Sequence, residues 1–215
     1  AWFGRNLIAA SIARTVASRL LGVEVQIDAV TISPFSLSVE IDGLRVANPP
    51  GWGTPLALSA GKIEVDVSGD SDTTLLVVDK VGLHDVEIWF VQDGTRSNVS
   101  QLVDNLSSKE AAPAKQESAG PGMELLLRLL VLDNVSAHVT QRMAVVGSVP
   151  VDVRLAHVEV RDIKGKTAGK DLAEQLVGHV FEATMLAVIS HAGGQIPDAI
   201  GKGIGASIDA GGRLG

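Results

Sequence analysis

The chain contains no cysteine and no tyrosine, and it has only three Trp and four Phe among its 215 residues. The absence of cysteine excludes disulfides, thiol catalysis and Cys-ligated zinc, and it leaves the redox compartment open. Because aromatic residues are scarce, the interior must be built mainly from Val, Ile, Leu and Ala. With 46% apolar residues, the chain has enough aliphatic material for the core of one large or two small domains.

Basic residues are also few, with 18 Lys and Arg against 25 Asp and Glu and a net charge of −7. A nucleic-acid-binding protein needs clustered positive charge to neutralise phosphates, so we exclude that class of partner. The sequence holds no P-loop, GxSxG or HExxH motif and no GxGxxG after a strand. We therefore expect no enzymatic activity, no cofactor and no metal. Five widely separated histidines are expected at the surface: His84, His138, His157, His179 and His191.

Residues 1–22 predict an amphipathic helix. Apolar residues recur at steps of three and four from Trp2 to Leu21, and Gly22 supplies a stop signal. Three arginines within this segment exclude a membrane span, because each costs roughly 2.5–3.5 kcal/mol near the bilayer centre. Two roles stay open for the helix. It packs on the core, or it continues a membrane anchor that precedes Ala1, with Trp2 and Phe3 at the membrane interface.

From Val23 onward the apolar period changes from 3.6 to 2, which predicts strands with one apolar face. This face is either an ordinary core or a lipid-binding surface. The residues that we assign to it are Val25, Ile27, Val39, Ile41, Val65, Ile88 and Phe90.

The alternation slips at one place in each of five strands, where the apolar step is three instead of two. The slips fall at Ile27–Val30, Ile41–Leu44, Leu83–Val86, Leu132–Val135 and Leu155–Val158. A step of three turns the rest of a strand to the other face unless one residue is bulged out. We expect bulges rather than tight turns, because turns would leave only very short strands. Repeated bulges bend a sheet and so predict a strongly curved, open or groove-like one.

The chain is expected to form two unequal modules. The first, residues 23–106, holds strands and a short helix capped near Ser97. Residues 107–122 lack any large apolar residue and predict a disordered linker. The second module, residues 123–192, reads as a hairpin followed by a helix at about 170–191. The predicted fold class is therefore α+β: a curved, bulged, mainly antiparallel sheet of two modules, with an N-terminal helix and C-terminal helices.

Residues 193–215 form a glycine-rich tail that carries Ile196, Ile200, Ile204 and Ile208, each four residues after the last. This spacing gives a narrow apolar stripe on a weak helix, since each glycine costs about 1 kcal/mol relative to alanine. The tail is either frayed, or it docks on a partner, a membrane or a neighbouring subunit.

Several segments together resemble a known family. The strand pair VEVQIDAVTIS and LSVEIDGLRVANPPGWG is followed by GKIEVDVSGD, VGLHDVEIWFV and DGTRSNVSQLVDNL. The most specific matches are NPPGW at Asn48–Trp52 and the Ser-Asn pair at residues 97–98. Over about residues 5–190 the chain resembles the N-terminal domain of the AsmA-like bacterial envelope proteins, as a short member. The resemblance implies a periplasmic protein anchored to or associated with the inner membrane, with a β-groove for lipid.

Two functional hypotheses follow. In the first, a membrane-associated module shields an acyl chain on the seven-residue apolar face. In the second, a structural subunit assembles with itself or with a larger envelope complex, and the apolar face is an ordinary core. With 215 residues the chain supplies about two modules, too few to form a lipid bridge across the periplasm. The candidate docking residues are Trp2, Phe3, Ile196, Ile200, Ile204 and Ile208, and the expected partners are membrane lipid, a second copy or an envelope complex.

Overall fold

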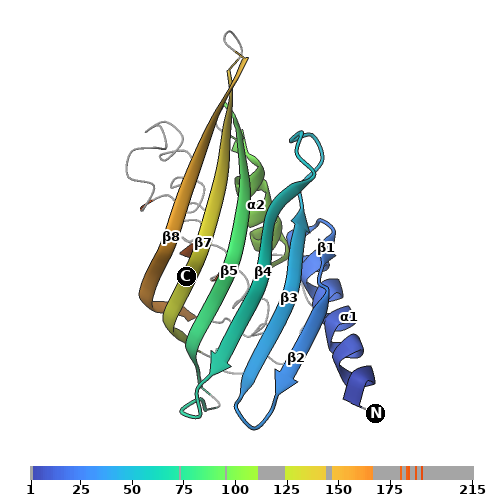
Figure 1. Cartoon of the computed structure of the whole chain (residues 1–215), viewed down its shortest axis with the longest axis vertical. Coiled ribbons are helices and arrows are strands. Elements are labelled where there is room, and N and C mark those ends of the chain that lie inside the picture. The colour runs from blue at the N-terminus through green and yellow to red at the C-terminus, as the bar shows by residue number, and fades with distance from the viewer. Residues whose placement is uncertain are drawn as a thin grey trace.

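The computed structural model describes residues 2–72, 74–94, 96–110, 124–143 and 147–166, together with Val180, Ala183, Thr184, Ala187 and Ser190. Within this part of the chain, eight strands form one open, mixed and mainly antiparallel sheet, and two helices lie beside it (Figure 1). The predicted α+β class is thereby confirmed.

Nearly all neighbouring strands of the sheet are antiparallel. Their order is β1-β3-β4-β5-β7-β8, with β2 beside β3 and β6 beside β5. Only β5 and β7 run parallel, from Leu75 opposite Glu124 to Asp93 opposite Arg142. The strands of the two expected modules therefore belong to one sheet. Their bounds are β1 Val25–Gln26, β2 Ala29–Ser33, β3 Ser38–Ala47, β4 Leu56–Val67, β5 Leu75–Asp93, β6 Arg96–Ser97, β7 Glu124–Met143 and β8 Gly147–Lys166.

Helix α1 spans Trp2–Leu21, as the apolar spacing predicts. It ends at Gly22, whose φ of +67° lies in the left-handed region that glycine enters without steric cost. The Gly22 N–H donates a 3.0 Å hydrogen bond to the carbonyl of Ser18 and so satisfies one of the last free carbonyls of the helix.

Helix α2 spans Asn98–Glu110 and begins where the sequence predicts a cap. Ser97 Oγ accepts a hydrogen bond from the Ser100 N–H, and the Ser97 N–H donates to Ser100 Oγ, both at 2.9 Å. This reciprocal pair satisfies two donors at the helix start. The helix continues four residues past its expected end at Leu106, because residues 107–110 contain no glycine or proline to stop it. The rest of the predicted linker lies outside the described residues.

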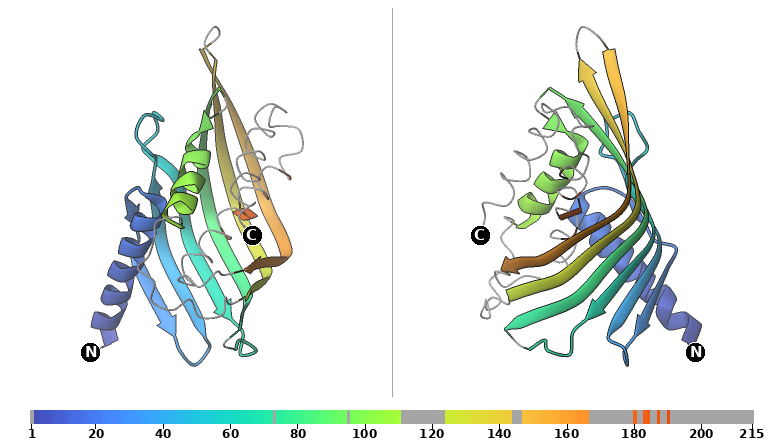
Figure 2. Two further views of the ribbon diagram at one scale, coloured as in Figure 1. Left: turned by 180° about the vertical axis from the view of Figure 1, so that it is seen from behind. Right: turned by 60° about the vertical axis from the view of Figure 1, so that its left-hand side comes forward.

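The sheet is strongly curved, and α1 and α2 lie on its concave side (Figure 2). Helix α1 crosses the β1–β2 edge, and α2 lies over the middle of the sheet. Val180, Ala183, Thr184 and Ala187, from the helix predicted at about 170–191, are helical and pack toward the core at the spacing i, i+3, i+4, i+7. The core is mainly aliphatic, with Phe90 among its buried residues. Its largest fully buried side chains are Ile88, Leu102, Leu127, Leu130, Leu132, Val77, Val78, Val81, Val86, Val135 and Val139.

At the slips in the alternation we expected bulges, in which one strand has an extra residue and its neighbour does not. Instead, five neighbouring strands each leave one residue without a pairing partner, and these residues lie side by side across the sheet: Gly43, Gly61, Asp85, Asn134 and Ala156. Because adjacent strands skip together, pairing resumes in the same register on both sides. We call these five residues the kink row. Register shifts occur elsewhere, at Val46/Ala47 and Asp66/Val67.

The kink row keeps the apolar residues on the concave face. Gly43, Asp85 and Asn134 have φ values of +64°, +53° and +53°. In β5, Val81 and Leu83 are buried before the kink, and Val86, Ile88 and Phe90 are buried after it. The extra residue therefore absorbs the step of three without turning the strand over. Tight turns are excluded at four of the five predicted slips, since the strands run through them, while the fifth slip separates β1 from β2.

Candidate functional site

The seven residues predicted for the apolar face all contribute to one concave cluster, but they divide into two groups. Val25, Ile27, Ile88 and Phe90 are only 2–4% exposed, so they are closed core. The other three, Val39, Ile41 and Val65, are half-buried and pack at the margin of this core.

The half-buried residues form a continuous strip on β3 and β4. Val39 lies directly opposite Val65, and Ile41 lies opposite Ile63. Ile63 has the same half-buried environment and completes a set of four side chains, which we call the apolar strip. The strip lies on the side of the kink row nearer the β2–β3 hairpin. It carries no polar group, so it can bind hydrocarbon without directional contacts.

The predicted docking residues are described only in part. Trp2 and Phe3 begin α1, but their side chains lie outside the described part of the structure. Ile196, Ile200, Ile204 and Ile208 lie outside it altogether. No helix among the described residues is both long enough and apolar enough to cross a membrane.

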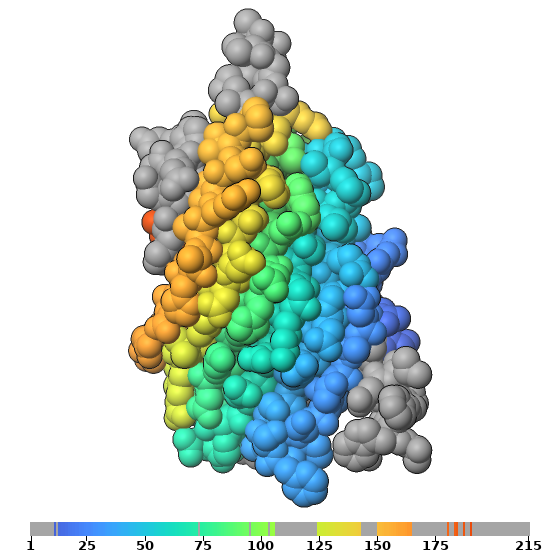
Figure 3. Space-filling view, in the orientation of Figure 1, coloured from blue at the N-terminus to red at the C-terminus, as the bar shows by residue number. Residues whose placement is uncertain are grey.

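The strands present their outward side chains on the convex face (Figure 3), and charged residues among them form ion pairs. Lys62 lies 3.0 Å from both Glu40 and Glu64. Its hydrogen bond to Glu64 raises the pKa of the lysine and lowers the pKa of that carboxyl group. Glu64 is also near Lys80 and His84, at 3.7 and 3.6 Å. The ion pairs are partly exposed, so each contributes little to stability.

Two histidines flank one aspartate farther along this face. His84 Nδ1 lies 3.2 Å from Asp133 Oδ2, and His157 Nδ1 lies 2.5 Å from Asp133 Oδ1. The hydrogen bond with Asp133, with a smaller one from Glu159, raises the pKa of His157 above its ordinary value of 6.5. Among the described residues, no group of three His, Asp or Glu side chains is placed to hold a metal ion.

The cluster of His84, Asp133 and His157 could have been predicted by comparing the strands with one another, although the spacing of residues along any one strand does not reveal it. His84, Asp133 and His157 each stand next to a member of the kink row. If the slips of neighbouring strands are aligned with one another, the three residues fall side by side. The observed register does pair Asp133 with His84 on one side and with His157 on the other.

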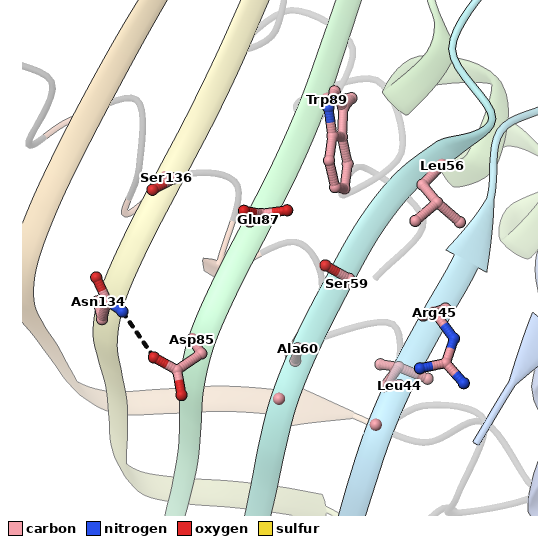
Figure 4. A pocket seen from close by; sticks show the side chains of 12 residues that line it. Leu44, Arg45, Leu56, Ser59, Ala60, Asp85, Glu87, Trp89, Asn134 and Ser136 are labelled. Carbon is pink, nitrogen blue, oxygen red and sulfur yellow. Dashed lines mark hydrogen bonds between the residues drawn. The ribbon is translucent and has the colours of Figure 1, made fainter. Parts of the chain in front are cut away.

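A shallow hollow of about 310 Å³ lies on the convex face over the kink row (Figure 4). Its small residues include Gly43, Gly61 and Ala60, and Trp89 stands at its side. The indole of Trp89 stacks on His138 at 5.6 Å between ring centroids. Asp85 accepts a 2.6 Å hydrogen bond from the Asn134 amide, as the dashed line in Figure 4 shows. The hollow is open to solvent.

The two most specific segments of the AsmA-like resemblance meet in space. The Asn98 side-chain amide donates a 3.0 Å hydrogen bond to Oδ1 of Asn48. Trp52 Nε1 donates at 2.8 Å to the side-chain oxygen of Gln101. The NPPGW segment is therefore held against the first turns of α2 by side-chain hydrogen bonds.

No protein-family model matches the chain, and no curated protein matches it. The AsmA-like resemblance therefore stays a prediction from the segments quoted above.

Proposed function

We propose that the chain is a non-catalytic, AsmA-like module of the periplasm, associated with the inner membrane, which binds a lipid acyl chain on its concave face. The observation that carries this proposal is the apolar strip. Its four aliphatic side chains adjoin the closed core, where Val65 and Ile63 lie opposite Val81 and Leu83 of β5, but are themselves only half-buried. A surface of this kind supports a ligand that is apolar and has no fixed shape.

The driving force for such binding is the hydrophobic effect. Burial of apolar surface contributes about 25 cal/mol per Å², and an acyl chain laid along the strip would gain contact with both β3 and β4. The strip has no charged or hydrogen-bonding group. The acyl chain is therefore the part of the lipid that this surface recognises, and the headgroup remains outside it.

Mass spectrometry of the purified full chain tests the proposal. We expect phospholipid to co-isolate with the protein in mild detergent. Ile41→Asp or Val65→Asp should abolish this, because each places a charge in the strip. Ala156→Asp is the matched control, since it places the same charge on an exposed residue of β8. Circular dichroism establishes that the variants fold. Folded wild-type protein without lipid, or lipid retained by Ile41→Asp, would overturn the proposal.

A second candidate function is assembly, favoured by the position of β8 at the end of the sheet order. This strand is 20 residues long, and no described strand pairs with its outer edge. Open edges can pair with another chain, so a second copy or an envelope complex could extend the two modules. Sedimentation across a range of concentrations tests this. A stable oligomer that is lost on deleting residues 193–215 supports assembly, and a monomer at every concentration contradicts it.

A further inference from the structure

The β2–β3 hairpin ends in three exposed apolar side chains. Ile32 is 48% exposed, Leu37 is 47% exposed, and Phe35 is as exposed as in an extended peptide, at 101%. They are the exposed large apolar residues of the described part of the chain. Isolated exposed apolar residues are ordinary, but three gathered on one turn are not. We call residues 32–37 the hairpin tip.

The backbone of the tip is strained at one of these residues. Leu37 has a φ of +51°, in the left-handed region where a leucine is disfavoured and Gly or Asn would be easier to place. Its conformation is fixed, since its carbonyl accepts a 2.9 Å hydrogen bond from the Val67 N–H of β4. The leucine side chain is half-exposed and so gains little from packing. Strain kept at such a position points to a role for the side chain outside the fold.

The tip is also free of charge. All eleven residues from Ala29 to Val39 are uncharged, although one residue in five of the whole chain is charged. The polar residues of the tip are serines, and Ser36 Oγ lies 2.8 Å from Ser38 Oγ. An uncharged projection with apolar side chains can enter the boundary between lipid headgroups and acyl chains without moving an ion out of water.

A second element reaches the same end of the molecule. Helix α1 begins at this end, as the position of the N-terminus beside the hairpin shows in Figures 1 and 2. Its first residues are Trp2 and Phe3, and aromatic residues are enriched where proteins meet the membrane interface.

We propose that the hairpin tip inserts into the surface of a lipid bilayer, with the start of α1 directed at the same surface. A protein partner fits less well. A specific interface buries about 800 Å² on each side, which three side chains on a projecting turn cannot supply. A bilayer needs no complementary shape.

This inference deepens the proposed function and rests on it for the choice of a bilayer as partner. Val39, the first residue of the apolar strip, follows Leu37 by two positions, and its partner Val65 precedes Val67 by two. Docking by the tip would therefore hold one end of the strip at the membrane, where an acyl chain is available.

Co-sedimentation of the full chain with phosphatidylcholine vesicles tests the insertion. We expect binding that persists at about 1 M salt, where the Debye length is only about 3 Å. Phe35→Ser should reduce the partition coefficient about tenfold or more, and adding Leu37→Ser should reduce it further. Phe35→Trp should keep binding and show a blue shift of its emission with vesicles. Arg96→Trp is the matched control, because it lies at the opposite end of β5 and should show no added shift.

Three results would overturn the inference: equal binding by Phe35→Ser, binding only to vesicles with phosphatidylglycerol that salt releases, or self-association that Phe35→Ser abolishes. A different result would contradict the proposed function. Phe35→Ser leaves the apolar strip intact, so lipid should still co-isolate with this variant by mass spectrometry. Loss of vesicle binding with retained lipid is the expected pair of results, whereas vesicle binding without co-isolated lipid would contradict only the proposed function.

Discussion

Asn98 and Asn48, fifty residues apart in the chain, are joined by a 3.0 Å hydrogen bond between their side-chain amides. Asn98 is fully buried and makes two further bonds. Its Oδ1 accepts from the Val91 N–H at 2.9 Å, and its Nδ2 donates to the Trp89 carbonyl at 2.6 Å. One side chain thus connects the end of β5, the start of α2 and the loop before β4.

Asn98→Ala is expected to destabilise the protein by about 3 kcal/mol, because it leaves one buried and two partly buried polar groups without this partner, at about 1–3 kcal/mol for each fully buried group before relaxation. Urea unfolding followed by circular dichroism measures the change. Gln26→Ala is the control, since Gln26 is exposed and should change the free energy of unfolding by less than about 0.5 kcal/mol. An equal change in the free energy of unfolding for the two variants would show that the hydrogen bonds of Asn98 do not stabilise the fold.

Gly43 is the position in the kink row where a side chain is least tolerated. Its φ is +64°, and a Cβ atom there would collide with the carboxylate of Asp28. That carboxylate is paired with Arg45, which holds the pKa of Asp28 below its ordinary value. Gly43→Ala should therefore cost about 2 kcal/mol or more, from the left-handed backbone and from displacement of Asp28.

Gly69→Ala separates this effect from a general response to alanine. An added Cβ at Gly69 meets no atom within 4 Å, and its φ lies outside the left-handed region. Thermal unfolding of both variants provides the comparison. The Gly69 variant should unfold within a few degrees of wild type, while the Gly43 variant should unfold clearly earlier. If the two match, the kink at Gly43 is not constrained as the structure indicates.

The sequence predicted which face of each strand is buried, but it did not predict which strands lie side by side. The alternation around Ile41 and Ile88 places both on the concave side, because apolar side chains at period 2 must be buried together. The parallel pairing of β5 with β7 could not be predicted in this way. A pattern along one strand states which face is buried but not which strand lies beside it.

The candidate sites also depend on contacts between distant segments, which a pattern along one strand does not reveal. The strain at Leu37 depends on a backbone hydrogen bond from Val67, thirty residues later, so no local pattern reveals it. Likewise the slip between Leu83 and Val86 indicates a kink in one strand. Only the pairing of β5 with β4 and β7 shows that this kink lies beside the kinks of its neighbours. The division between core and strip was also hidden, because Ile41 and Ile88 have the same local pattern but differ in their burial in the folded chain.

His157 gives the protein a pH dependence of known sign. Its pKa is raised in the folded state by Asp133, so the protonated form stabilises the fold. This contribution is fully present below the ordinary value of 6.5 and is lost as the pH rises through the raised pKa. Asp133→Asn should move the His157 titration, followed by NMR of the imidazole ring protons, back toward its ordinary value. It should also flatten the loss of stability over this pH range.

Asp152→Asn is the matched control for this titration. Asp152 is 2.8 Å from His138 and makes no contact with His157 among the hydrogen bonds and ion pairs of the described residues. The substitution should therefore leave the His157 titration unchanged. A His157 titration unaffected by Asp133→Asn would show that the short contact between the two side chains does not persist in solution.

The distinction between closed core and open strip has a measurable consequence for stability. Ile88 is 2% exposed, and Ile88→Ala should cost about 3–4 kcal/mol through lost burial and the cavity that remains. Ile41 is half-buried, and Ile41→Ala should cost only about 1 kcal/mol in lipid-free protein, because much of its surface already meets solvent.

Urea unfolding of both variants with and without phospholipid measures these costs. Lipid should add stability to the wild type and the Ile88 variant but less to the Ile41 variant, since the proposed function places the acyl chain on the strip. Equal costs without lipid would mean that the concave face is closed along its whole length.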